Sequence, residues 1–231
     1  MFHLVRRAAS VLGASMVLIL SLASPAFATD PELTISGEPT EEEAAEIVEQ
    51  WQRFLSHFDG YADCLEPLEV RVVDRAEDWY HAKDVGPIAA FYVFPPDPMI
   101  YIEHRKVVPG NLLHEMAHHL DISCGLAEGS IGDAFRIAQG IADERGWFEG
   151  GTWSAVPAEV FAEAVVKYFG GSTQIDISRD AVRVIEMMAR VTDAEVRARD
   201  EQRVAASVSG TLLFGDMQTL HVVPGGGFFA F

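Results

Sequence analysis

Basic residues are scarce in this sequence. Its 17 lysines and arginines stand against 35 aspartates and glutamates, and the formal net charge is −18. Proteins that bind nucleic acid need a basic surface for the phosphates, so this charge argues against nucleic acid as a partner. It also argues against attraction to an anionic membrane surface.

Long apolar runs are equally scarce, and the one that is present lies near the N-terminus. Arg6 and Arg7 precede an apolar stretch from Val11 to Leu22, and Ala26-Phe27-Ala28 has the small-residue pattern of a cleavage site. This order predicts a signal peptide over residues 1–28, cleaved after Ala28, and a secreted protein. An uncleaved anchor is the alternative, but the run is short for a bilayer span. We therefore expect no stable membrane anchor after cleavage.

The chain has only two cysteines, Cys64 and Cys124. In an exported protein an even number of cysteines favours a disulfide, whereas two buried free thiols are the alternative. The bridge would close a long loop of the chain, which stabilises the folded state chiefly by restricting the unfolded one.

After the signal peptide, roughly 200 residues remain, which is enough for one domain with a hydrophobic core. We expect that domain to span 29–231, with 29–39 and 222–231 as candidates for flexible ends. The patterns predict an α+β fold with a short mixed sheet. The expected strands are 68–73, 88–94 and 99–103, and which of the last two forms the sheet edge stays open. The expected helices are 41–58, one from 109 onward, 131–145, 157–169, 177–189 and 192–208.

The most informative motif is His114-Glu115-Met116-Ala117-His118, an HExxH pattern. Side chains four apart share one face of a helix, so both imidazoles can reach one metal ion. Glu115 can then act as the general base of a hydrolytic zinc site. His119 points about 100° away and is expected to be a hydrogen-bonding neighbour.

Such a site needs a third protein ligand, and two carboxylates are candidates. Asp121 lies on the same helix, but a straight helix places it roughly 10 Å from His114, so we expect it to orient a neighbouring group instead. Glu159 and Glu163 lie four apart on a later helix. A cation bound to Glu159 and an imidazole N–H donated to Glu163 would relieve their repulsion. A solvated acidic face is the alternative.

The segments HEMAHHLD and PAEVFAEAV resemble the gluzincin metallopeptidases, in particular the catalytic domain of the anthrax lethal factor family. The resemblance covers residues 101–169, and the two helices carry it. It implies a zincin-like fold in which His114, His118 and Glu159 bind one Zn²⁺, Glu115 is the general base and Glu163 orients a ligand histidine. That family has a tyrosine shortly before the third ligand, where this chain has Gly150-Gly151-Thr152-Trp153.

The sequence thus predicts a secreted zinc metallopeptidase with a peptide or protein substrate. The alternative is an exported module that contains zinc and binds a peptide or cell-wall partner without cleaving it. A third interpretation is a helical domain in which the motif occurs by accident. The group that polarises the substrate carbonyl stays open. Weak candidates for it are Tyr101, His104 and His221, whereas Tyr168 faces away from Glu159.

Overall fold

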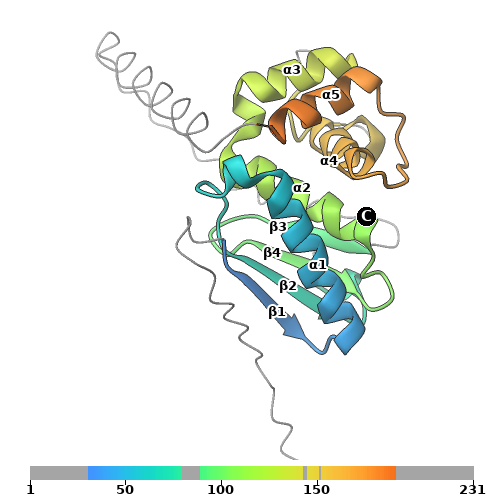
Figure 1. The fold of residues 1–231 in the computed structure, drawn as a ribbon. Coiled ribbons are helices and arrows are strands. Elements are labelled where there is room, and N and C mark those ends of the chain that lie inside the picture. The colour runs from blue at the N-terminus through green and yellow to red at the C-terminus, as the bar shows by residue number, and fades with distance from the viewer. Residues whose placement is uncertain (1–30, 80–88, 143–144, 151, 191–231) are drawn as a thin grey trace, which may run out of the picture.

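The computed structural model describes residues 31–79, 89–142, 145–150 and 152–190. This part of the chain has an α+β fold, with a mixed four-stranded sheet and five α-helices (Figure 1). The predicted signal peptide, the predicted helix 192–208, the tail 222–231 and His221 lie outside these residues. Within them, no helix has the length and apolar character needed to span a bilayer.

The sheet has the strand order β1-β2-β4-β3. Strands β1 (Leu33–Gly37), β2 (Leu68–Val73) and β4 (Met99–Glu103) run parallel, and β3 (Ala90–Val93) pairs antiparallel with β4. The three predicted strands are confirmed. Of the two that were candidates for the sheet edge, β3 forms it and β4 lies inside the sheet. Strand β1 is a correction, because it lies inside 29–39, which was taken as a candidate flexible end. All of its residues pair with β2, from Leu33 opposite Leu68 to Gly37 opposite Val72.

Helix α1 (Glu41–His57) begins where the sequence predicts it. Thr40 Oγ1 accepts a hydrogen bond from the Glu43 backbone N–H, and the Glu43 carboxylate accepts one from the Thr40 N–H. This capping box satisfies two N–H groups that the first helical turn would leave without partners. The negative charges of three acidic residues in that turn also stabilise the helix by interacting with the positive end of its dipole.

Helix α2 (Pro109–Cys124) carries the HExxH motif. Proline at its first position has the φ that a helix needs, and Gly125 ends the helix in the left-handed conformation with φ 59°. Helices α1 and α2 pack against each other, and both contact the sheet on the same side (Figure 1). Their apolar side chains form one core with those of β2 and β4 that point toward them.

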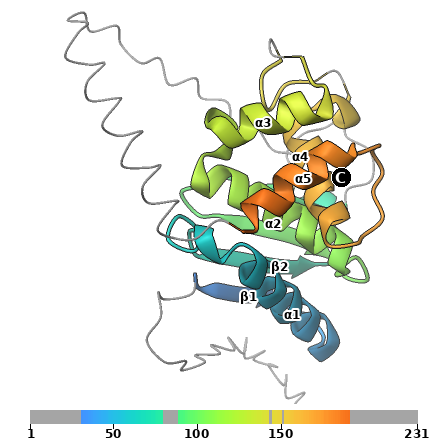
Figure 2. The ribbon, with the colours of Figure 1, turned by 45° about the horizontal axis from the view of Figure 1, so that its top comes forward.

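The C-terminal helices form a lobe on the other side of α2. Helix α4 (Pro157–Tyr168) packs on α2, while α3 (Ser130–Gln139) and α5 (Arg179–Met188) pack on each other, and α5 also packs on α4 (Figure 2). Helix α3 ends earlier than the predicted residue 145, because Gly140 takes a left-handed φ of 76°. Helix α5 begins at Arg179 instead of residue 177, because the Ser178 side chain caps it.

Cys64 and Cys124 form a disulfide, as predicted, with their Cα atoms 5.2 Å apart. The bond joins the last residue of α2 to the segment that follows the short turn Asp59–Tyr61 after α1. It therefore ties the helix of the HExxH motif to the α1 side of the core. A disulfide fits an extracellular protein.

Candidate metal centre

The helices α2 and α4 bury a group of ionisable side chains between them. Main-chain packing of these helices brings together residues more than 40 positions apart in the sequence. The buried set consists of His114, Glu115, His118, Glu159 and Glu163. Burial of so many charged groups is costly unless they bind one another or a cation.

Three of these residues converge on one point. Nε2 of His114 lies 3.1 Å from Oε2 of Glu159, and Nε2 of His118 lies 3.3 Å from the same oxygen. The two Nε2 atoms are 3.2 Å apart. Within the described residues, these three side chains form the group that could hold a metal ion, with their ligand atoms all within 4.8 Å of one another. We call them the triad.

The donor set of the triad fits a divalent transition metal. Two imidazole nitrogens and one carboxylate oxygen are the ligands that zinc takes in hydrolytic sites, although cobalt, nickel or copper also accept them. Oε1 of Glu159 is buried and has no hydrogen-bond partner among the described residues. Glu159 itself is 0 % exposed, so its charge cannot be balanced by solvent. A bound cation would supply that balance.

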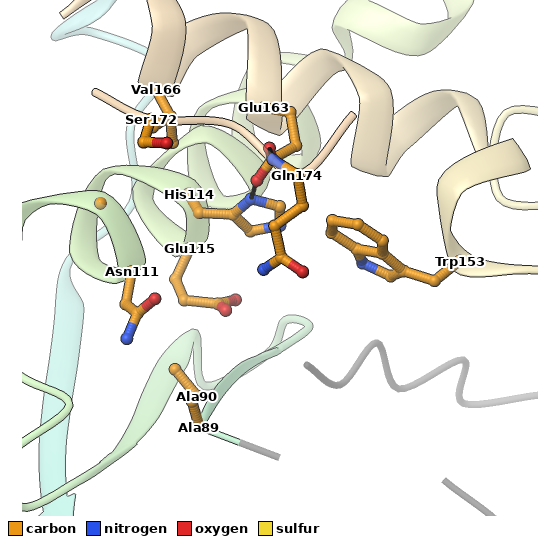
Figure 3. A pocket seen from close by; sticks show the side chains of 11 residues that line it. Ala89, Ala90, Asn111, His114, Glu115, Trp153, Glu163, Val166, Ser172 and Gln174 are labelled. Carbon is orange, nitrogen blue, oxygen red and sulfur yellow. Dashed lines mark hydrogen bonds and ion pairs between the residues drawn. The ribbon is translucent and has the colours of Figure 1, made fainter. Parts of the chain in front are cut away.

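Glu163 fixes the orientation of one triad histidine. Its Oε1 lies 3.2 Å from Nδ1 of His114, and only Nδ1 can be the donor in this contact. Figure 3 shows this contact, and the tautomer leaves Nε2 of His114 facing Glu159 and His118. The second oxygen of Glu163 accepts a hydrogen bond of 2.6 Å from the backbone N–H of Gln174.

Trp153 also contacts the triad, a role that no pattern in the sequence predicts. Its indole N–H donates to Oε2 of Glu159 over 3.0 Å, and its ring stacks on the His114 ring at 6.1 Å with an interplanar angle of 26°. It lies six residues before Glu159, near where the resembling family has its tyrosine. Its position shortly before Glu159 is the feature of the sequence that could have indicated a role for Trp153 at the site.

The charges of the triad are strongly coupled. Burial alone would lower the pKa of His114, but hydrogen bonds with Glu159 and Glu163 raise it to about 9. Burial lowers the pKa of His118 despite the attraction of Glu159. Burial would raise the pKa of Glu159, but the two histidines lower it overall. The carboxylate is thus the stable form of Glu159, and it favours one positive charge beside it.

Glu115 lies next to the triad but outside it. Burial, and to a lesser degree repulsion from Glu159, raises its pKa to about 8, against the opposing effect of His114. Its Oε2 has no hydrogen-bond partner among the described residues. Its side chain lines a small pocket together with His114, Trp153 and Gln174 (Figure 3). Glu115 is therefore a buried acidic side chain at the wall of this pocket.

Asp121 stays away from the triad. Its carboxylate accepts hydrogen bonds from the Trp147 indole and from the Ala127 backbone N–H. It thereby holds the turn after α2 and the Trp147 segment in place. That it also orients a neighbouring group of the site, as the sequence predicts, stays a prediction.

The weaker candidates from the sequence lie elsewhere. Tyr101 stacks between Trp79 and Phe91 on the sheet face opposite α2, and His104 contacts Glu43. Tyr168 bonds to His57 over 2.7 Å. None of the three lines the pocket beside Glu115. His119 is a hydrogen-bonding neighbour, as predicted, and contacts the Glu66 carbonyl and the Tyr92 hydroxyl.

Comparisons with family models, curated proteins and solved structures found no match for this chain.

Proposed function

We propose that the protein is a secreted zinc-dependent peptidase with a zincin-like fold. The observation that carries this proposal is the position of Glu115. It follows His114 of the triad directly in the sequence, and its side chain lines the pocket that His114 also lines. A site that only bound a metal would have no need of a buried carboxylate there.

His114, His118 and Glu159 would hold the ion. Zinc bound there would polarise the scissile carbonyl and make a water molecule more acidic. The chain supplies the remaining steps. Glu115 accepts a proton from the attacking water and passes it to the nitrogen of the leaving amine. Glu163 keeps His114 in the tautomer that can bind a cation, and Trp153 holds the Glu159 carboxylate.

Several features support this proposal. The order of the elements, with a mixed sheet, an HExxH helix and a later helix that supplies a glutamate, is that of zincins, which is an analogy at the level of the fold. The resemblance of the two helices to the lethal factor family points the same way. The disulfide fits a secreted enzyme.

A peptide library tests the proposal. The purified chain, loaded with one equivalent of zinc, should cleave members of the library, cleavage should stop with a chelator, and zinc should restore it. A chain that holds zinc but cleaves no peptide in the library would favour the non-proteolytic binding module instead.

A further inference from the structure

The pocket beside the triad needs a donor for the oxygen of the scissile carbonyl, which becomes negatively charged during attack on a peptide bond. Stabilisation of that oxygen is often the largest single contribution to acyl-transfer catalysis. Trp153 is a poor candidate, because its indole N–H already donates to Glu159. The tyrosines and His104 considered above lie outside the pocket.

We infer that the side-chain amide of Gln174 is this donor, an inference that rests on the proposed peptidase function. Gln174 lies in the connection between α4 and α5, and its side chain projects into the pocket that Glu115 and Trp153 also line (Figure 3). Its carboxamide makes no hydrogen bond to another described residue. Both N–H groups are therefore available to a substrate.

The backbone of Gln174 is held by the metal centre itself. Its N–H donates to Oε2 of Glu163 over 2.6 Å, while Oε1 of the same carboxylate meets Nδ1 of His114. One carboxylate thus positions both a ligand histidine and the residue that carries the amide. This contact fixes the backbone position from which the Gln174 side chain reaches into the pocket.

The rest of this connection is fixed as well. Lys167 donates to the Ile177 carbonyl over 2.7 Å, and Gln139 donates to the Asp176 carbonyl over 2.9 Å. The Gln139 oxygen in turn accepts the Ser178 N–H, and Ile177 is buried. The segment that presents Gln174 is therefore anchored on both α3 and α4, although it has no regular secondary structure.

The substitution that tests this inference is Gln174→Met, which keeps an unbranched side chain of similar length and removes the N–H groups. We expect kcat for a library peptide to fall roughly 10²- to 10³-fold with KM little changed, because the donor acts mainly in the transition state. Zinc affinity should stay within twofold of the parent. Gln52→Met, the same substitution at an exposed position of α1 outside the pocket, is the matched control and should keep kcat.

A binding measurement separates this inference from the peptidase proposal. The probe is an alanine phosphinic tripeptide, whose charged P–O oxygen takes the place of the reacting carbonyl oxygen. On the zinc-loaded protein, Gln174→Met should weaken binding of the probe at least tenfold, and Gln52→Met should not. If the parent binds the probe in this Gln174-dependent way but cleaves no peptide, the peptidase proposal fails and the donor assignment stands. If the parent and Gln174→Met bind the probe with equal affinity, or if neither protein binds it, the assignment is overturned.

Discussion

The indole N–H of Trp153 lies 3.0 Å from Oε2 of Glu159, the same oxygen that faces Nε2 of both His114 and His118. A neutral donor on that oxygen restricts the carboxylate to one orientation without competing for the cation. The stack of the indole on the His114 ring adds a second constraint. Trp153 thus acts on two of the three triad residues at once.

Trp153→Phe should keep the ring stack and remove the N–H. We expect zinc affinity to fall roughly tenfold, since partners of metal ligands contribute on this scale. The matched control is Trp147→Phe, which removes an indole–carboxylate bond at Asp121. That variant should lose stability and keep its zinc affinity. Competition with a chelating dye measures both, and equal zinc affinity in Trp153→Phe and the parent would remove Trp153 from the site.

Glu115→Gln separates the base from the ligands. The amide has the same size but cannot take a proton from water, so kcat should fall by roughly 10²- to 10⁴-fold. Zinc content should not change, because Glu115 lies outside the triad. Steady-state cleavage of a library peptide and elemental analysis of the same sample give both numbers. Unchanged turnover in this variant would show that another group removes the proton.

Local sequence patterns predicted the elements of the site well. The spacing of His114 and His118 places both on one face of α2, because that relation depends on helix geometry alone. Three helix N-termini are equally local signals, marked by Thr40, Pro109 and Pro157. The spacing of Glu159 and Glu163 on one helix indicates Glu159 as a candidate third ligand, but only the packing of α4 on α2 brings it to the histidines.

The parts that the sequence could not predict depend on tertiary contacts. Strand β1 is short, and its order comes from pairing with β2, a partner more than 30 residues away. Trp153 and Gln174 lie outside the α-helices and strands, so no periodic pattern marks them. Each is brought to the site by a hydrogen bond to a buried glutamate of α4.

The disulfide makes a prediction about stability. Cys64 and Cys124 are 60 positions apart, and a loop of that length contributes about 4 kcal/mol in the chain-entropy model. The double variant Cys64→Ala/Cys124→Ala should therefore melt about 10 °C lower than the parent. Differential scanning calorimetry measures the shift. Exported parent protein in which alkylation labels both thiols without prior reduction would contradict the bridge.

His119 makes stability depend on pH. Burial lowers its pKa from 6.5 to about 4, so the folded state keeps it neutral where the unfolded chain binds a proton. The contribution of neutral His119 to the free energy of unfolding is present above pH 6.5 and is lost as the pH falls toward 4. From pH 7 to pH 5 the parent should lose roughly 2 kcal/mol more of unfolding free energy than His119→Gln. Urea unfolding of both proteins with a chelator present measures this difference, and equal losses would contradict the assignment.

The central claim is that Glu159, and not Asp121, completes a zinc site with His114 and His118. The most direct test is zinc affinity by competition with a chelating dye in the parent, Glu159→Ala, Glu163→Ala and Asp121→Asn. Glu163→Ala should weaken binding roughly 10- to 100-fold, because it frees the His114 ring, and Glu159→Ala should weaken it more. Asp121→Asn should bind zinc like the parent, since that carboxylate contacts Trp147 and Ala127. Loss of zinc in Asp121→Asn, with zinc retained in Glu159→Ala, would contradict the account.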